Sequence, residues 1–453
     1  MQEIIDSLEL EHPFEVVGDE YLDSCFAVSE LATSSIGAVG STLAALIQDA
    51  ALSSNTPSIR VNQRLASLWF ACSIQPIDWQ MPPIWDAIAG DYQTRDGWIK
   101  LHTNLAHHRQ AALAVLEVES IRGSVAAAVR NWSADQLEAE IVKAGGVAAA
   151  LRSRREWQAH PQGIAVASEP LISWGKVKQA RTNFSPKSKS RPLAGLRVLD
   201  LTRVLAGPVA TRTLAGFGAE VLRLDPPTWE EANVVPDITL GKRCARLDLK
   251  QAADRQVFEG LLNNADVLVH GYRPSALHDL GYGESVRQAI SENLIEVSLD
   301  AYGWTGPWAQ RRGFDSLVQM SSGIAHAGMQ WAKQQQPASL PVQALDHATG
   351  YLMAAAVIRL LQRALNGEGL GSAQLSLART AELLIAHPQD LATGFKAVPS
   401  SADFSASIEL TPWGQAKRLR PALDIDGVAM RWRLPASDLG SSAACFKAIN
   451  TPY

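Results

Sequence analysis

The 453-residue sequence predicts an α/β protein with a parallel-sheet domain and a smaller α+β domain. Its length is enough for two or three domains, because a domain usually has about 100–200 residues. After residue 191, short apolar runs alternate with helical segments, which is typical of a parallel sheet covered by helices on both faces. The preceding segment is rich in Lys, Ser, Arg and Pro and indicates a linker. We therefore expect an N-terminal region at 1–175, a linker at 176–191, the sheet domain at 192–390, and a C-terminal extension at 391–453 that packs on the other domains.

The sheet domain has a regular order of elements. The run Leu196–Thr202 is short and mostly apolar, as a strand buried on both faces requires. Pro208 suits the first turn of a helix that continues to Phe217, because that turn needs no N–H donor. Further strands are expected at Glu220–Leu224, Cys244–Leu249, Asp266–His270, Leu294–Leu299 and Gln374–Leu377, and further helices at Ala252–Leu262, Phe314–Ala325 and His347–Leu365.

The N-terminal region is less regular. Apolar residues at helical spacing predict a helix over Ile36–Leu52, and Asp96–Leu101 indicates a turn that enters a short strand. The segment Ser133–Gln136 has the residues of a capping box and predicts the start of another helix. We detect no tandem repeat in the sequence.

Composition excludes several classes of protein. The 41 basic and 46 acidic residues give a net charge of -5, which argues against a nucleic-acid binder. The four cysteines are too far apart in sequence for a zinc or redox pair, so free thiols in a reducing cytosol are expected. The acidic N-terminus is unlike a secretory signal, and the apolar stretches Ile36–Ile47 and Tyr351–Leu361 are too short to cross a membrane. We expect a cytoplasmic protein with no membrane partner.

The first strand–turn–helix of the sheet domain is where a nucleotide would bind in such a sheet. Its turn, Arg203–Pro208, has one glycine instead of G-x-G-x-x-G, which argues against NAD or FAD. Lys242 and Arg243 lie next to an expected strand and suit a phosphate. Spacing alone favours a solvated basic turn for this pair. Neither a P-loop lysine motif nor a G-x-S-x-G elbow occurs at a strand–helix turn, which excludes P-loop kinases and ordinary α/β-hydrolases.

Three histidines, His102, His107 and His108, invite a metal interpretation. Adjacent residues on a helix point about 100° apart, so His107 and His108 do not easily face one ion. No carboxylate lies beside them at the spacing of metal ligands. We therefore expect a packing or hydrogen-bonding role and no metal site.

Asp346 lies just before the apolar helical stretch Tyr351–Leu361. An aspartate in this position can serve as a helix N-cap. The same position can also keep a partly buried carboxylate ionised, as a carboxylate nucleophile requires. From the residues alone, the cap is favoured over the nucleophile.

A series of motifs in the sheet domain resembles the family III CoA-transferases, a group that includes the α-methylacyl-CoA racemases. The resemblance covers about 190 residues in family order. It rests on Pro192–Thr202, Val204–Pro208, Phe217–Val221, Lys242–Arg243, Leu247–Lys250, Ala265–Val269, Tyr272–Pro274, Leu277, Leu280–Gly281, Tyr302–Gly303, Thr305–Pro307 and Gly313–Asp315.

This resemblance implies a function and a set of site residues. Asp346 falls at the position of the family's catalytic aspartate, which forms a mixed anhydride with the acyl group, so the resemblance favours the nucleophile over the cap. The loop Val204, Leu205, Ala206 and Gly207 would lie along CoA, and Lys242 and Arg243 would contact its nucleotide. A Rossmann-like CoA domain in an interlocked homodimer is implied. The substrates would be a CoA thioester and a carboxylic acid acceptor, with no tightly bound cofactor.

The sequence also departs from the family pattern. A glycine-rich loop that covers the aspartate in formyl-CoA transferase has no counterpart, Leu205 replaces a glutamine, and Asp279 replaces an arginine that contacts CoA. Residues 84–165 resemble the family's small domain, which normally follows the CoA domain but here precedes it. The chain therefore resembles a circular permutant, or a fusion in which an incomplete copy precedes a fuller one.

Three functions follow from these observations. The first is an acyl-CoA:carboxylate CoA-transferase that acts through an aspartyl-acyl anhydride and an aspartyl-CoA thioester. The second is a 2-methylacyl-CoA racemase, which needs two acid/base groups on opposite faces of the α-carbon. It is disfavoured because Phe314 stands where racemases have a histidine, and His347 adjoins Asp346. The third is a non-catalytic CoA-binding protein.

Overall fold

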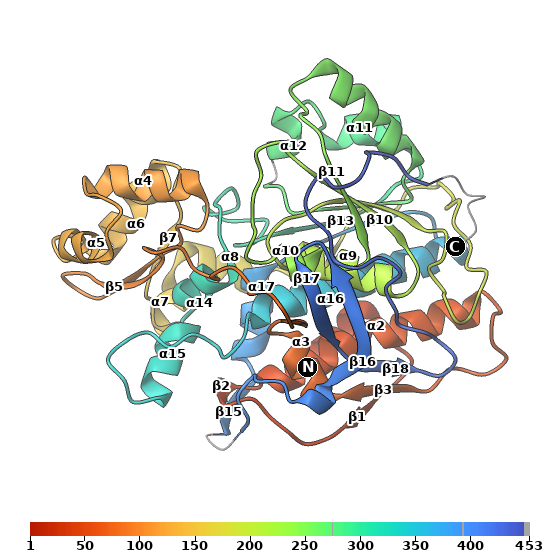
Figure 1. Ribbon diagram of the computed structural model, residues 1–453, viewed down its shortest axis with the longest axis horizontal. Helices are drawn as coiled ribbons and strands as arrows, with labels where there is room; N and C mark the ends of the chain where they lie inside the picture. Colours follow the sequence, from red (N-terminus) through yellow and green to blue (C-terminus); the bar gives the residue numbers. More distant parts are fainter. Residues whose placement is uncertain (274, 392–393, 448–453) are drawn as a thin grey trace.

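The computed structural model describes residues 1–273, 275–391 and 394–447 (Figure 1). Its centre is a seven-stranded sheet of order β11-β10-β9-β12-β13-β14-β8, in which the first six strands are parallel and β8 is antiparallel. The strands are β8 (Ser173–Trp174), β9 (Arg197–Leu201), β10 (Glu220–Asp225), β11 (Lys242–Arg246), β12 (Val267–His270), β13 (Ile295–Asp300) and β14 (Ser372–Ser376). The predicted α/β class is confirmed. A strand lies at each of the six predicted places, although β11 and β14 each begin two residues earlier than predicted and also end earlier.

Helices cover both faces of this sheet. Side chains that alternate along β9 point to opposite faces, so Val198 packs on one side and Leu199 on the other. The Val198 face packs against α9 (Ala206–Gly216) and α16 (Ala344–Leu365). The Leu199 face packs against α11 (Ala252–Asn264).

The order of the strands reverses at β9. The chain runs outward from β9 through β10 to β11, then returns to β12 on the other side of β9. In open parallel sheets such a reversal leaves a crevice at the carboxyl ends of the two strands. The segments Thr202–Ala206 and Gly271–Arg273 lie at this edge.

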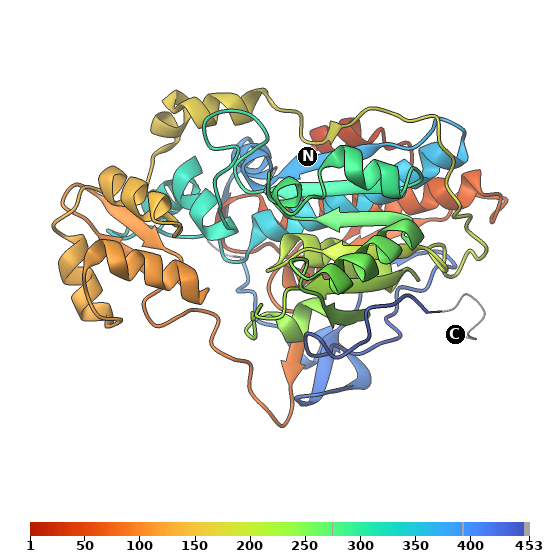
Figure 2. The ribbon, with the colours of Figure 1, turned by 90° about the horizontal axis from the view of Figure 1, so that it is seen from above.

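A small unit projects from the main body (Figures 1 and 2). It has its own apolar core beneath a three-stranded sheet, and it comprises β5 (Gly90–Gln93), β6 (Trp98–Leu101), α4 (Ala106–Leu116), α5 (Arg122–Val129), α6 (Ala134–Lys143) and β7 (Ala148–Ala150). α6 begins where predicted, but the predicted capping box is absent. Ser133 makes no side-chain cap bond, and the Asp96 carboxylate accepts the Ala134 N–H at 2.9 Å instead.

The two ends of the chain form joint sheets. β18 (Leu423–Ile425) pairs with β3 (Ile59–Asn62), and β17 (Gly414–Leu419) pairs with β4 (Ile74–Pro76). The same part of the structure contains α1 (Gln2–Leu8), β1 (Glu15–Val17), β2 (Ser24–Phe26), α3 (Gln63–Trp69), β15 (Pro388–Leu391) and β16 (Phe404–Thr411). The expected N-terminal region 1–175 therefore contributes to two separate bodies.

The long helix α2 (Val28–Asp49) begins earlier than the predicted Ile36–Leu52. By length and composition alone it could span a membrane, but 83% of its most apolar window is buried inside the structure. It packs along α16 in the main core. The other helices are α7 (Arg154–Ala159), α8 (Pro161–Ser168), α10 (Val235–Ile238), α12 (Ala276–Asp279), α13 (Glu284–Ile290), α14 (Asp315–Ser322), α15 (Ile324–Trp331), α17 (Leu377–Ile385) and a 3₁₀ turn at Ser401–Asp403.

The helices α9 and α16 approach closely at Gly350. A Cβ atom added there would lie 2.4 Å from the Ala206 carbonyl oxygen and 2.8 Å from Val209 Cβ. A backbone atom cannot yield as a flexible side chain can, so only glycine allows this approach. The contact fixes the N-terminal end of α9 against the first turns of α16.

We expect Gly350→Ala to lower the free energy of unfolding by about 1–3 kcal/mol, as overpacking of a core does. Urea unfolding measures this change. Gly260→Ala is the matched control, because Gly260 lies exposed within α11 with no neighbour near its missing Cβ. There the helix propensity of alanine should raise stability by about 0.5–1 kcal/mol. Equal changes in the free energy of unfolding of the two variants would contradict the close approach of α9 and α16.

Candidate active site

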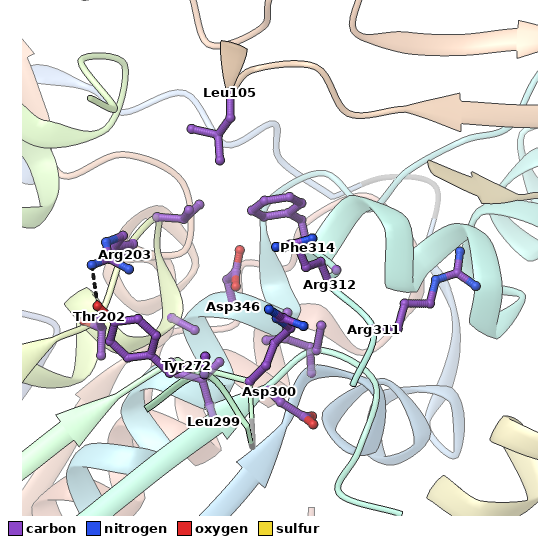
Figure 3. Close-up of a pocket in the computed structure, with 18 of the residues that line it drawn as sticks. Leu105, Thr202, Arg203, Tyr272, Leu299, Asp300, Arg311, Arg312, Phe314 and Asp346 are labelled. Carbon is purple, nitrogen blue, oxygen red and sulfur yellow. Dashed lines mark hydrogen bonds between the residues drawn. The ribbon is translucent and has the colours of Figure 1, made fainter. Parts of the chain in front are cut away.

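A cavity of about 370 Å³ opens at the carboxyl ends of β9 and β12 (Figure 3). Its lining includes the loop after β9, the loop after β12, the end of β13, the segment Arg311–Phe314 ahead of α14, and the small unit through Leu105, His107 and His108. Figure 3 shows Asp346 in the middle of the cavity, with Arg203 to one side and Phe314 to the other. The crevice predicted by the strand order thus contains the predicted nucleophile.

Asp346 is the third residue of α16, whose N-cap is Gln343. The interpretation of Asp346 as an N-cap is therefore wrong. Another carboxylate serves this end of the helix, because Asp315 Oδ2 accepts the N–H groups of Leu345 at 2.9 Å and Asp346 at 3.0 Å. Gln319 donates to the second oxygen of Asp315. The Asp346 side chain is thereby left free to face the cavity.

The Asp346 carboxylate accepts a hydrogen bond from the backbone N–H of Ala206, the first residue of α9. Burial and the neighbouring Asp315 carboxylate raise the pKa of Asp346 well above its usual value, and the Ala206 N–H opposes this rise. Burial also raises the pKa of Asp315 to about 6, against the N–H donors of Asp346, Gln319 and Leu345. Two buried carboxylates therefore compete for ionisation beside the cavity.

The loop ahead of α9 is held in a strained conformation. Val204 has φ of 63°, which is rare for a β-branched residue and costs about 1–3 kcal/mol. Buried Glu231 compensates, since its Oε2 accepts the Val204 N–H at 2.9 Å and its other oxygen pairs with buried Arg223. Of the loop residues implied in CoA binding, Val204 and Ala206 line the cavity. Leu205 is buried, and Gly207 packs against Thr202.

The structure does not bring Lys242 and Arg243 to the cavity. The Lys242 ammonium is buried beneath the loop, where it donates to Asp200 and to the Pro208 carbonyl, both at 3.0 Å. Arg243 pairs with Glu220 on the neighbouring strand. Lys242 thus has an anionic partner already, and its role here is to hold the turn after β9.

A slot of about 110 Å³ continues from the cavity across the ends of β9, β10 and β11. The slot is mainly apolar, and the exposed Lys250 is one of the residues that line it. Arg203 and Tyr272 line both spaces. The Arg203 guanidinium lies 4.9 Å from the ring centre of Tyr272 and donates to its hydroxyl at 2.7 Å. The slot was not predicted from the sequence, although Tyr272 and Lys250 belong to motifs that resemble the family.

Arg273 and Arg312 also line the cavity. Among the residues that the structure describes, neither has a carboxylate partner, whereas Arg311 pairs with Glu138 at 2.9 Å. Burial and Arg273 lower the pKa of Arg312. The two arginines therefore supply uncompensated positive charge that suits an anionic ligand.

His102 and His108 pack the small unit against the cavity wall. The ring of His102 stacks on Phe314 at 4.0 Å, and that of His108 meets Phe314 edge-on at 6.0 Å. Burial lowers the pKa of His102 to about 4 and that of His108 to about 3, so both are neutral at pH 7. Over the described ranges of the chain, no three or more His, Cys, Asp or Glu side chains gather in a way that could hold a metal ion.

Residues 193–401 match the sequence model of CoA-transferase family III. We refer to this matched stretch as the family III segment. The chain is 35% identical over 207 residues to an acetyl-coenzyme A transferase of Hypoxylon pulicicidum, over 44% of this chain and 34% of that protein. It is 33% identical over 193 residues to a probable fatty acyl-CoA transferase of Mycobacterium tuberculosis, over 39% and 48% of the two chains.

A third relative is a human succinyl-CoA:glutarate CoA-transferase, 32% identical over 200 residues, or 41% of this chain and 45% of that one. Each match spans about half or less of the curated relative. A crystal structure of a hypothetical protein from Mycobacterium tuberculosis aligns at a TM-score of 0.39 and 30% identity, over 43% of this chain and 57% of that chain. The family III segment contains Asp346 and the loop ahead of α9.

We expect Asp315→Asn to lower the pKa of Asp346, because the amide oxygen can still accept both N–H groups while the competing charge is gone. The change should be about one pH unit or more, as for other close carboxylate pairs. Isotope-edited infrared spectra of the protonated carboxyl, with Asp346→Asn for assignment, measure the titration. An unchanged midpoint would show that the two carboxylates do not interact.

Proposed function

We propose that this chain is an acyl-CoA:carboxylate CoA-transferase in which Asp346 is the nucleophile. The observation that carries the proposal is a buried aspartate in a family III segment, facing a cavity and touching the N-terminal N–H of α9. The acyl-CoA donor and the carboxylic acid acceptor are substrates, and the scheme needs no tightly bound cofactor.

CoA would lie along the edge of the sheet. The pantetheine would follow Val204 and Ala206 toward Asp346, and the adenine would enter the slot beside Lys250. Arg203 and Arg273 would face the phosphates, since guanidinium groups bind phosphate well. In this arrangement Lys242 supports the loop and Arg243 takes no part.

The reaction would begin when an Asp346 oxygen attacks the thioester carbonyl. The carbon–sulfur bond breaks, CoA leaves as a thiolate, and an acyl-aspartyl anhydride forms. The thiolate then attacks the aspartyl carbonyl, which releases the donor acid and leaves an aspartyl-CoA thioester. The acceptor carboxylate attacks the carbonyl of this thioester, which breaks the carbon–sulfur bond, releases the CoA thiolate and forms a second anhydride between Asp346 and the acceptor. The thiolate then attacks the acceptor's carbonyl in this anhydride and leaves as the new acyl-CoA. Asp346 is regenerated as a carboxylate.

Each tetrahedral intermediate carries a negative charge that needs N–H donors. The first turn of α9 has such donors, because the first N–H groups of a helix lack partners within it. The Ala206 N–H already points at the Asp346 carboxylate. The same N–H can therefore stabilise charge that develops there during transfer.

The structure argues against the racemase alternative, because His347 cannot serve as its second acid/base group. His347 is fully buried in the core, where its ring stacks on Phe70 at 5.3 Å, and it does not line the cavity. Burial lowers its pKa to about 3. Phe314, in the place of the racemase histidine, carries no proton to transfer. The non-catalytic alternative is distinguished by the next experiment.

We expect Asp346→Asn to abolish transfer and to raise the melting temperature at pH 7. An amide cannot form the anhydride. The folded-state pKa of Asp346 lies above its unfolded value, so its ionised form opposes folding at neutral pH, and asparagine removes that cost. Hydroxylamine should trap an acyl-aspartate on the wild type with acetyl-CoA but not on the variant. A variant that transfers at the wild-type rate would contradict the proposed nucleophile.

We expect Lys250→Ala and Lys242→Ala to separate binding from folding. Lys250→Ala should weaken CoA binding about tenfold, the size of one lost charge-assisted hydrogen bond, without changing the melting temperature of the free protein. Lys242→Ala should cost about 3–5 kcal/mol of stability, because buried Asp200 loses its partner. Isothermal titration with CoA and thermal unfolding measure the two effects. If Lys242→Ala weakened CoA binding and Lys250→Ala did not, the nucleotide would bind at Lys242 instead.

A further inference from the structure

Two parts of the structure have the same order of elements. The helix α2 and the helix α16 both have 22 residues, and each is followed by a short strand and then a second helix. In both copies the strand ends at the cap of that second helix. Asn62 accepts the Leu65 N–H at 2.9 Å, and Ser376 accepts the Arg379 N–H at 3.2 Å.

The start of the long helix repeats as well. Its third residue is Glu30 in α2 and Asp346 in α16, and Ala-Thr follows after one further residue in both. Few other residues are identical, which is why no repeat is detected in the sequence. The element order and the capping of α2–β3–α3 thus repeat those of α16–β14–α17, the part of the family III segment that carries Asp346.

The two copies contact each other reciprocally. At one end of the helix pair, α2 and α16 are joined through Asp49, which accepts from Gln362 at 2.7 Å and from Asn366 at 2.8 Å. At the other end, Phe70 beyond α3 stacks on His347 at the start of α16. In the matching place, the Ala27 N–H at the start of α2 donates at 3.0 Å to the carbonyl of His387, beyond α17.

Such an exchange, in which the end of each copy meets the start of the other, is the pattern of a twofold interface between two subunits. Here both sides belong to one chain. The small unit follows the first copy in sequence, yet it closes the cavity of the second copy through Leu105, His107 and His108.

The first copy is not itself a site. Glu30 is exposed. The acid at the repeated position therefore faces solvent, whereas Asp346 is buried and lines the cavity.

We propose that the segment from α2 to β7 is a built-in second subunit: one chain forms one complete site, and no second copy of the chain is needed. This replaces the homodimer expected from the resemblance. Within the chain, α2 already packs along α16, and the cover of the cavity comes from the same chain.

Light scattering over a wide concentration range tests the assembly without reference to activity. The expected mass is that of one chain, 48.9 kDa, at every concentration. A concentration-independent mass of two chains would overturn the proposal, whether or not the protein transfers CoA.

A complementation experiment tests the site and rests on the proposed function. Two full-length chains with different tags are co-expressed, one with Asp346→Asn and one with Leu105→Glu, which places a carboxylate in the cavity. Each variant alone should be inactive, and its melting temperature reports whether it folds. Activity should stay absent in the mixture, because no chain has both an intact nucleophile and an intact cover.

Recovered activity in the mixture would mean that the small unit of one chain serves another chain, and it would overturn the proposal. Glu30→Gln is the matched control for Asp346→Asn, since it removes the acid at the repeated position. It should leave transfer within about twofold of the wild type, whereas loss of transfer would show that the first copy takes part in catalysis.

Discussion

The close crossing of α9 and α16 is the constraint on which the candidate site depends. Gly350 lets the backbone of α9 reach α16, and this approach brings the Ala206 N–H to the Asp346 carboxylate. Without it, the cavity would hold a buried acid with no donor to stabilise its charge. The sheet positions both helices on one face, and the reversal of strand order leaves the space beside them open.

Buried carboxylates hold the rest of the site by binding backbone N–H groups. Asp200 accepts the Thr202 N–H at 2.8 Å, and Glu231 accepts the Val204 N–H. Asp315 does the same at the start of α16. The loop after β9 and the start of α16 are thus each fixed by a carboxylate that is itself paired or hydrogen-bonded, which offsets part of the cost of its burial. Such fixed donors and charges are what electrostatic stabilisation of a transition state requires.

Much of the sheet domain could be predicted because its signals are local. Apolar runs of strand length and helical spacing are sufficient to find β9 through β14 and α16. The site was predicted less completely. The cap at α16 comes from Asp315, a residue 31 positions before Asp346, and no local pattern reports such a contact. Lys242 and Lys250 have the same charge in neighbouring motifs, and only the fold separates the buried cation from the exposed one. The joint sheets of the two chain ends pair strands that are over 300 residues apart in sequence. Hydrophobic periodicity is a local signal, so it could not predict these pairings.

The repeated helix has an evolutionary consequence. Counted from the shared acid position, the residue of α2 that corresponds to Gly350 is Ser34. In α16 this position presses against α9 and accepts only glycine. In α2 this position is half-buried and carries a serine side chain. Under the proposal of a built-in second subunit, only α16 has to meet the geometric requirement that the Ala206–Asp346 contact imposes. Substitutions at the matching position of α2 are then limited by packing alone.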